Sequence, residues 1–165
     1  MAVLPVRTYP DPVLKQTAVP VGAPDRDALR LAQDLVDTMR SHERCVGLAA
    51  NQVGVLRRCV VVDVTGHRRA RSCHGLIVMF DPELVWSEGA EVAREGCLSL
   101  PDLTANVRRP ERITVRGTDR SGDPTVVRAD AFEARALLHE MDHLDGVLFL
   151  DRVANLDTDV FRRRV

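Results

Sequence analysis

The segment HEMDH, residues 139–143, constrains this chain more than any other feature. His139 and His143 are four residues apart, so on an α-helix both imidazole rings project from the same face. That spacing lets two nitrogen atoms bind one metal ion while Glu140 stays beside the ion as a base. The alternative is a helix with two ordinary exposed histidines. Metal binding is favoured because the helix is expected to be buried, where unpaired histidines are costly.

The helix that would carry this motif has recognisable start and stop signals. Asp130 is the expected N-cap, and Glu133 follows it at the spacing of a capping box. Gly146 marks the C-terminal end, where a left-handed residue is favoured. Apolar residues between these signals occupy more than one side of the helix: Ala134, Leu137, Leu138 and Met141. A helix with that pattern is expected to lie in the interior.

A catalytic metal ion needs a third protein ligand and an open coordination position. In the pattern HExxHxxGxxH the third ligand would fall on Phe149, which cannot ligate, and no glutamate follows Glu140. The remaining candidate lies upstream, at Cys97 in the segment EGCLSLPD. A thiolate is a strong ligand, and Gly96 would allow a close approach. On spacing alone, a buried structural cysteine is an equal alternative for Cys97.

The rest of the chain predicts strands between two helices. A first helix begins after Asp25, with apolar residues at helical spacing from Leu29 to Met39. CVGLAANQVGV (45–55) predicts a strand-like loop that something approaches closely. Strands are predicted at 59–64, 75–80, 83–87, 112–117, 124–128 and 147–150. This order favours an α+β fold with antiparallel sheets, and residues 1–165 are expected to form a single catalytic domain.

Composition excludes several classes of protein. The 165 residues include 23 basic and 24 acidic side chains, a net charge of −1, which lacks the basic footprint of a DNA-binding protein. No segment approaches the roughly 18 apolar residues that span a bilayer, and no signal-peptide pattern opens the chain. We therefore expect a cytoplasmic protein without a DNA or membrane partner. The four cysteines contain no CxxC pair and predict no disulfide framework.

Three segments together resemble the motifs of the peptide deformylase family: VGLAANQ (46–52), EGCLS (95–99) and HEMDHLDG (139–146). The resemblance implies antiparallel sheets packed around a central buried helix that carries HExxH. It also implies a metal-dependent hydrolase that removes the formyl group from the N-terminal formyl-methionine of new peptides and releases formate. A zinc metallopeptidase that uses the same helix to cut peptide bonds is the alternative.

The resemblance assigns roles residue by residue. The metal ligands would be Cys97, His139 and His143, and Glu140 would act as general base and acid. Gln52 and the backbone N–H of Leu98 would stabilise the oxyanion. Apart from the resemblance, the strand-like segment 45–48 offers backbone groups to an extended peptide along Val46, Gly47 and Leu48. Candidates for the apolar pocket of the methionine side chain are Val46, Leu98, Phe132 and Ala136, with ordinary core residues as an equal alternative for these four. The implied cofactor is one divalent ion, Fe(II) in the first place, with Zn, Ni or Co as alternatives.

Further side chains carry expectations of their own. Glu95 and Arg109 are expected to form an ion pair that orders EGCLS, and Asp142 either orients a neighbouring group or is a solvated helix residue. A closed structural zinc site would need a fourth ligand, but His67 and His74 lie in an arginine-rich loop and are expected to be solvated. The sequence departs from the family motifs at Cys45 and Leu138. The C-terminal FRRRV predicts a solvated tail, with contact to the ribosome as the alternative.

Overall fold

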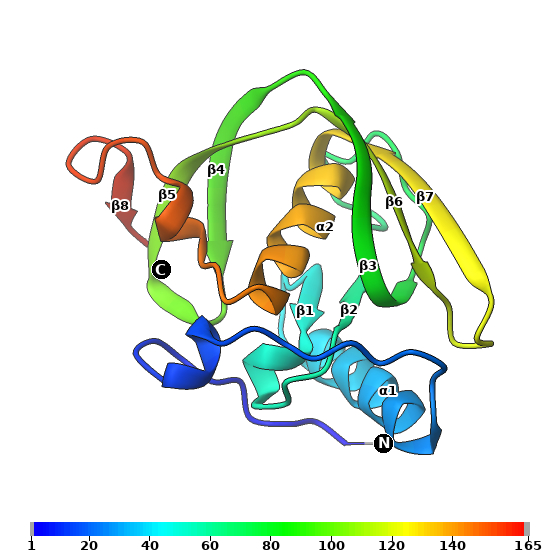
Figure 1. Cartoon of the computed structure of the whole chain (residues 1–165). Helices are drawn as coiled ribbons and strands as arrows, with labels where there is room; N and C mark the ends of the chain where they lie inside the picture. The colour runs from blue at the N-terminus through cyan, green and yellow to red at the C-terminus, as the bar shows by residue number, and fades with distance from the viewer. Residues whose placement is uncertain (1, 164–165) are drawn as a thin grey trace.

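The computed structural model describes residues 2–163, which form two α-helices, three short 3-10 helices and eight strands (Figure 1). The helices are α1 (Arg26–Ser41), α2 (Ala131–Leu144), η1 (Pro12–Lys15), η2 (Ala50–Val53) and η3 (Phe149–Arg152). The strands are β1 (Gly47–Ala49), β2 (Cys59–Val62), β3 (Ile77–Glu88), β4 (Glu91–Cys97), β5 (Leu100–Arg109), β6 (Arg112–Thr118), β7 (Pro124–Asp130) and β8 (Val160–Arg162).

The strands form two antiparallel sheets, which confirms the predicted α+β class. The larger sheet has the order β1-β2-β3-β6-β7, and the smaller has the order β4-β5-β8. In Figure 1, α2 lies between the smaller sheet and strands β3, β6 and β7. The HEMDH segment is therefore carried by the second and more C-terminal of the two α-helices.

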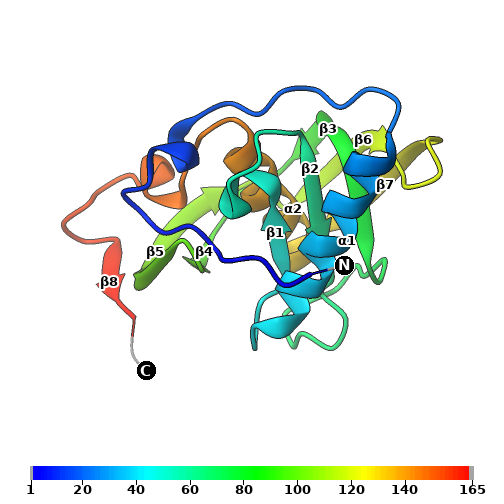
Figure 2. The same cartoon turned by 90° about the horizontal axis from the view of Figure 1, so that it is seen from below.

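The two helices pack on opposite faces of the larger sheet (Figures 1 and 2). Successive side chains of a strand point to opposite faces, and β2 uses both. Val60 and Val62 belong to the core cluster that includes the apolar residues of α2. Cys59 and Val61 belong to the cluster that includes α1. The fully apolar run of β2 follows from this position, because neither of its faces meets solvent.

The start of α1 is as predicted. The Asp25 side chain accepts a hydrogen bond of 2.7 Å from the backbone N–H of Ala28, so it caps a donor that the helix itself leaves unpaired. The buried side chains recur at helical spacing along one face: Ala28, Leu31, Ala32, Leu35, Val36 and Met39. This stripe packs against β1 and β2 and anchors the helix to the sheet.

The predicted capping box of α2 is wrong, although the predicted helix is present. Asp130 makes no side-chain cap, and its carboxylate accepts a hydrogen bond from the backbone N–H of Ser72 instead. Glu133 also turns away from the helix end, toward Ser72 and His74. Tertiary partners therefore outcompete the local cap. The other end agrees with expectation, because Gly146 has φ 72° and terminates the helix in left-handed geometry.

The predicted strand at 147–150 is wrong. Leu148 and Phe149 are buried against the smaller sheet, but the chain there forms a loop that leads into η3. The side chain of Asp151 accepts a hydrogen bond from the backbone N–H of Leu148, which stabilises the turn. The apolar residues of this segment are thus buried in the core without forming a strand.

Other strands differ from expectation in length or were not predicted. Segments 75–80 and 83–87 merge into β3, which continues through Asp81 and Pro82 with shifts in register against β6. The Asp81 carboxylate accepts hydrogen bonds from the backbone N–H groups of Val21 and Gly22, which fixes this irregularity. Strands β4 and β5 are rich in charged residues, and their polar pattern did not predict them.

The C-terminal FRRRV segment is only partly a tail. Val160–Arg162 forms β8 and pairs with β5, so the expectation of a solvated tail is wrong for Phe161 and Arg162. The last two positions, 164 and 165, lie outside the described residues. Within residues 2–163, the structure contains no helix that meets the length and apolarity needed to cross a membrane.

Candidate metal centre

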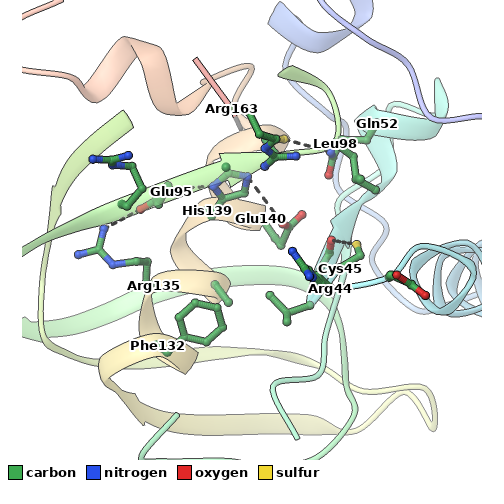
Figure 3. A pocket seen from close by; sticks show the side chains of 17 residues that line it. Arg44, Cys45, Gln52, Glu95, Leu98, Phe132, Arg135, His139, Glu140 and Arg163 are labelled. Carbon is green, nitrogen blue, oxygen red and sulfur yellow. Dashed lines mark hydrogen bonds and ion pairs between the residues drawn. The ribbon is translucent and has the colours of Figure 1, made fainter. Parts of the chain in front are cut away.

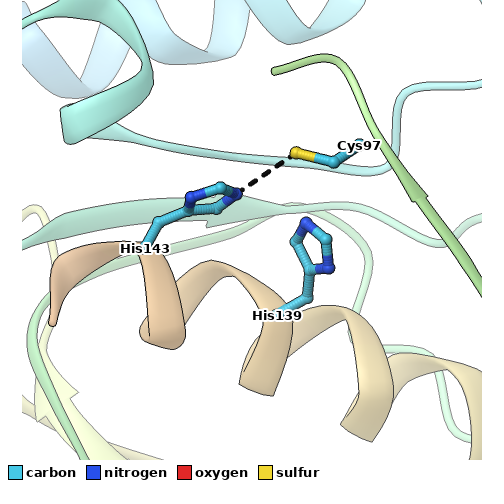
Figure 4. Close-up of side chains that lie close together, drawn as sticks. All are labelled: Cys97, His139 and His143. Atoms are coloured by element: carbon cyan, nitrogen blue, oxygen red, sulfur yellow. Dashed lines mark hydrogen bonds between the residues drawn. The ribbon is translucent and has the colours of Figure 1, made fainter. Parts of the chain in front are cut away.

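Cys97, His139 and His143 come together at the contact between α2 and the end of β4 (Figure 4). One ligand-type atom from each residue lies within 4.8 Å of the other two, and all three residues are buried. The Cys97 Sγ atom is 3.3 Å from Nε2 of His143. The two histidine rings stand one helical turn apart, with centroids separated by 5.0 Å and planes at 72°. The structure therefore brings the three predicted ligands into one site.

Local irregularity at the end of β4 positions the thiol. The pairing of β4 with β5 shifts register between Gly96 and Cys97, and Cys97 is the last residue of the strand. Such a shift redirects the side chain that follows it. The thiol consequently points away from the smaller sheet toward the histidines of α2 (Figure 4).

Glu95 orients His139. Its Oε1 atom lies 2.9 Å from Nδ1 of His139, which leaves Nε2 of that ring to face the site. The same carboxylate accepts hydrogen bonds from Arg109 at 2.9 Å and from Arg135 at 2.7 Å. The predicted ion pair of Glu95 with Arg109 is therefore present. Although burial opposes it, these partners, His139 first and then Arg109, hold the pKa of Glu95 well below its usual range.

Asp142 extends this network on the other side of Arg109. Its carboxylate accepts a hydrogen bond of 2.9 Å from Nη1 of Arg109 and two hydrogen bonds from Arg152. With an exposure of 8%, Asp142 is not a solvated helix residue. It orients neighbouring groups, although it reaches His139 only through Arg109 and Glu95. Such an extended, satisfied network rigidifies the histidine that it supports.

The electrostatics at Cys97 favour the thiolate, the form that binds metals. Burial alone would raise the pKa of the Cys97 thiol, but the adjacent rings of His143 and His139 hold it well below its usual range. Gln52 adds a donor, because its amide Nε2 lies 3.4 Å from the sulfur atom. The other contacts of this amide, Nε2 to Ser99 at 3.1 Å and Oε1 to the Ala49 N–H at 3.1 Å, fix its orientation.

Glu140 is buried beside the three residues and keeps one oxygen free. Its Oε1 atom is 3.9 Å from Nε2 of His139, and within the described chain Oε2 has no hydrogen-bond partner. Burial raises the pKa of the Glu140 carboxyl to about 7. A Cβ atom at Gly47 would come within 2.9 Å of the Glu140 side chain. Glu140 is therefore the group that the glycine-containing loop was expected to accommodate, and a larger residue at 47 would displace it.

A pocket opens beside these residues (Figure 3). The predicted substrate-binding residues that line it are Val46, Gly47, Leu98, Phe132 and Ala136, and Gln52, Cys97, His139 and Glu140 line it as well. Leu48 differs from expectation. Its side chain is 0% exposed and packs in the core cluster of α1, because adjacent residues of β1 face opposite sides. Only the backbone of Leu48 could therefore contact a substrate.

The sequence did not reveal several lining residues. The role of Arg135 was not predicted, because its guanidinium binds Glu95 and the carbonyl oxygen of Val107, which are far from it in the sequence. Glu95 and Gly96 also line the pocket, as neighbours of Cys97 that the sequence had singled out, and the remaining unpredicted lining residues are Glu43, Arg44, Cys45, Arg94 and Arg163. Only Cys45 gave a signal, as a departure from a glycine-containing motif. Its thiol donates a hydrogen bond of 3.2 Å to the carbonyl oxygen of Gly47.

The two histidines of the 67–75 loop are not simply solvated, which corrects that expectation. The His67 ring stacks on Phe132, with centroids 3.7 Å apart and planes within 1°. Nδ1 of His74 lies 2.6 Å from a carboxylate oxygen of Glu133. The loop thus packs on the first turn of α2, and its His67 ring covers one face of the Phe132 ring.

The donor set fits a divalent transition-metal ion. It provides one sulfur and two imidazole nitrogens, and a site with three protein donors leaves a position open for chemistry. Nδ1 of His143 is buried and, among the described residues, has no hydrogen-bond partner. Buried polar atoms without partners are rare, and two of the three among the described residues belong to His143 and Glu140, the third being Oδ1 of Asn51.

Fold and site together define an α+β protein with a buried three-donor centre of the kind that holds a catalytic metal ion. The model of the polypeptide deformylase family matches residues 3–159, so the chain belongs to the peptide deformylase family.

Individual relatives agree over nearly the whole chain. A peptide deformylase of Thermodesulfovibrio yellowstonii is 42% identical over 164 residues, which cover 99% of this chain and 97% of that protein. The crystal structure of a peptide deformylase from Legionella pneumophila has 38% identity and a TM-score of 0.85, covering 94% of this chain and 88% of that one. A peptide deformylase from Ehrlichia chaffeensis, in complex with actinonin, has 33% identity and a TM-score of 0.88, with 95% and 92% covered.

Proposed function

We propose that this chain is a peptide deformylase: a metal-dependent hydrolase that removes the formyl group from the N-terminal formyl-methionine of new peptides and releases formate. Residues 1–165 would act as one catalytic domain with α2 as its central helix. The observation that carries the proposal is the buried Glu140 carboxylate, with a free oxygen, beside the cluster of Cys97, His139 and His143. Membership of the family favours deformylation over the cleavage of internal peptide bonds.

Cys97, His139 and His143 would hold the metal ion, with Fe(II) as the proposed species and Zn, Ni or Co as alternatives. When bound, the ion would supply Lewis-acid chemistry, which polarises a carbonyl group and makes a water molecule more acidic. The protein prepares for this by holding His139 through Glu95 and by lowering the pKa of the Cys97 thiol, as described above.

Glu140 would move the proton. The reaction adds water across the formyl C–N bond, so a proton leaves the water molecule and one reaches the departing amine. A carboxyl with a pKa near 7 can both accept and return a proton at neutral pH. Its Oε2 atom has no hydrogen-bond partner among the described residues and could accept the proton, and the absence of a side chain at Gly47 leaves room for the carboxylate.

Gln52 and the backbone N–H of Leu98 would stabilise the negative charge that develops on the formyl oxygen. In the structure, the Gln52 amide nitrogen donates to Cys97 at 3.4 Å and to Ser99 at 3.1 Å. Hydrogen bonding to substrate therefore requires one of these contacts to be exchanged. The contact with sulfur is the weaker donor–acceptor pair and the one we expect to yield.

The edge of β1 would bind the peptide backbone. β1 is the terminal strand of the larger sheet, and an extended peptide can add to such an edge. The carbonyl of Val46 accepts a hydrogen bond from Asp63 on the β2 side, so by alternation Gly47 presents its carbonyl to the open edge. The methionine side chain would lie against Phe132 and Ala136, which line the pocket.

The test is formate release from formyl-Met-Gln-Gln-amide by protein purified without oxygen and loaded with Co or Ni. We expect turnover in the wild type. Glu140→Gln keeps the size of the side chain but cannot accept the proton, so we expect kcat/KM to fall by about 10²- to 10⁴-fold with one bound metal ion retained. Formate assays and elemental analysis measure the two quantities.

Two results would contradict the proposal. A fully active Glu140→Gln variant would remove the assigned base. Cleavage of unformylated casein at internal bonds, without formate release from the peptide, would identify a metallopeptidase instead. The expected cytoplasmic location and a ribosomal partner stay predictions.

A further inference from the structure

We propose that Arg44, Arg94 and Arg163 make this site selective for formyl-methionyl peptides with acidic residues directly after the methionine. The inference rests on the proposed deformylase function and specifies its substrate class. All three arginines line the pocket that contains Cys97 and Glu140, and all three are exposed at its mouth. None of them lies in the three motifs that carry the family resemblance, residues 46–52, 95–99 and 139–146.

The three guanidinium groups come from different walls of the pocket. Arg44 precedes β1, Arg94 lies on β4, and Arg163 follows β8. Figure 3 shows Arg163 and Arg44 on different sides of Glu140. A peptide whose formyl group reaches Glu140 and whose methionine faces Phe132 must leave the pocket through this mouth. Its second and third residues would therefore pass between positive charges.

Arg163 is held close to the reacting end of the pocket. Its backbone N–H donates a hydrogen bond of 2.9 Å to the carbonyl of Asp102, which continues the pairing of β8 with β5. Its guanidinium packs on Gly96, where a Cβ atom would overlap Nη2. The glycine next to Cys97 thus makes room for a cation directly beside the proposed metal ligand.

Arg94 is fixed by neutral partners. Its guanidinium lies over the Phe161 ring at 3.7 Å from the centroid, and Nε donates to the side-chain oxygen of Asn106 at 3.2 Å. Nη1 is 3.4 Å from the Thr104 hydroxyl. These contacts position the group at little entropic cost on binding and leave its charge uncompensated.

The carboxylates of the pocket do not neutralise the three arginines. Within residues 2–163, none of the three forms an ion pair. Glu95 is already paired with Arg109 and Arg135. Glu140 is buried and forms no ion pair with any of the three arginines. Among the described residues that line the pocket, Glu43 is the one exposed carboxylate, against three exposed guanidinium groups. The mouth therefore carries a net positive charge, and such a charge attracts anionic ligands.

The test compares three amidated peptides, so that no C-terminal carboxylate contributes: formyl-Met-Glu-Glu-amide, formyl-Met-Gln-Gln-amide and formyl-Met-Lys-Lys-amide. We expect kcat/KM for the Glu peptide to exceed that for the isosteric Gln peptide by about five- to twentyfold at low salt, as two or three exposed ion pairs would give. The Lys peptide should be the poorest substrate. The difference should lie mainly in KM and shrink toward one in about 1 M NaCl.

The variants assign this preference to the arginines. We expect the double variant Arg44→Gln/Arg163→Gln to lower the Glu/Gln ratio to about one or two, and Arg44→Lys/Arg163→Lys to retain most of it. Arg30→Gln, which removes an exposed arginine of α1 outside the pocket, is the matched control and should keep the full ratio. Circular dichroism checks that each variant folds.

The outcomes separate the two proposals. Equal turnover of the three peptides, or an unchanged Glu/Gln ratio in the folded Gln double variant, would overturn the selectivity while leaving the deformylase function intact. Absence of formate release from every peptide by the metal-loaded wild type would overturn the proposed function and the selectivity with it.

Discussion

Cys97 is the residue on which the candidate metal centre depends most, because it is the one donor that does not come from α2. The two histidines would remain one helical turn apart in any α-helix. The thiol reaches them only because β4 ends in an irregular register and because the smaller sheet lies against α2. Its lowered pKa also depends on His143 and His139, so donor position and donor chemistry are set together.

We therefore expect Cys97→Ser to lose metal affinity by more than the 10- to 100-fold that typically follows loss of an outer hydrogen-bond partner. A neutral hydroxyl is a much weaker ligand for a transition metal than a thiolate. Titration calorimetry with Zn or Co would measure the change. Cys73→Ser, at an exposed cysteine outside the site, is the control and should bind metal like the wild type. A Cys97→Ser protein with unchanged affinity would remove Cys97 from the ligand set.

At the scale of elements, the 67–75 loop is fastened to the first turn of α2 by one buried carboxylate. Glu133 is 0% exposed and accepts hydrogen bonds from the His74 backbone N–H at 2.7 Å and from the Ser72 hydroxyl at 2.8 Å. The loop in turn places His67 on Phe132, a lining residue of the pocket. Glu133 thus links the loop to the shape of the proposed methionine pocket.

Glu133→Ala should lower the free energy of unfolding by about 1–3 kcal/mol, because the partly buried donors of the loop lose their buried acceptor. Urea unfolding would measure this loss, and hydrogen exchange should become faster between residues 67 and 75. Glu88→Ala, which removes an exposed ion pair with Arg112, is the comparison and should cost no more than about 0.5 kcal/mol. Equal costs for the two variants would show that Glu133 does not fasten the loop.

At the scale of the whole molecule, the candidate centre lies where the smaller sheet meets α2. Cys97 belongs to the three-stranded sheet, whereas α2 packs its apolar side chains against the five-stranded sheet. Besides the candidate donors, the polar network of Glu95, Arg109 and Asp142 crosses this boundary. Arg135 of α2 crosses it as well, with hydrogen bonds to Glu95 and to the backbone carbonyls of Val107 and Glu91. A metal ion held by all three donors would therefore tie the smaller sheet to the rest of the protein.

Metal removal should consequently lower thermal stability. At a free metal concentration 100 times the Kd, binding to the folded state alone adds about 2.7 kcal/mol, which corresponds to a Tm increase of roughly 5–10 °C for a chain of this size. Calorimetry of apo and Zn-loaded protein would measure the increase. The same titration on the Cys97→Ser variant should give little or no shift. An equal shift in both proteins would place the stabilising ion elsewhere.

Local sequence patterns predicted part of the fold and of the candidate site. The start of α1 at Asp25, the left-handed Gly146 and the shared face of His139 and His143 all follow from interactions within a few residues. Cys97 was an open choice on spacing and became specific only through the resemblance of three motifs. Strands β4 and β5 were missed because their charged residues pair across the smaller sheet and line the pocket.

The amino-acid sequence by itself determined that His139, Glu140 and His143 lie on one helix, with both imidazoles on the same face, because helical periodicity acts over a few residues. Only the tertiary structure decided that Glu133 fastens a loop instead of capping α2, and that Glu95 orients His139. It also decided that Arg163 lies on Gly96. These partners are far apart along the chain, and their contacts form only when packing of the two sheets closes the long loops between them.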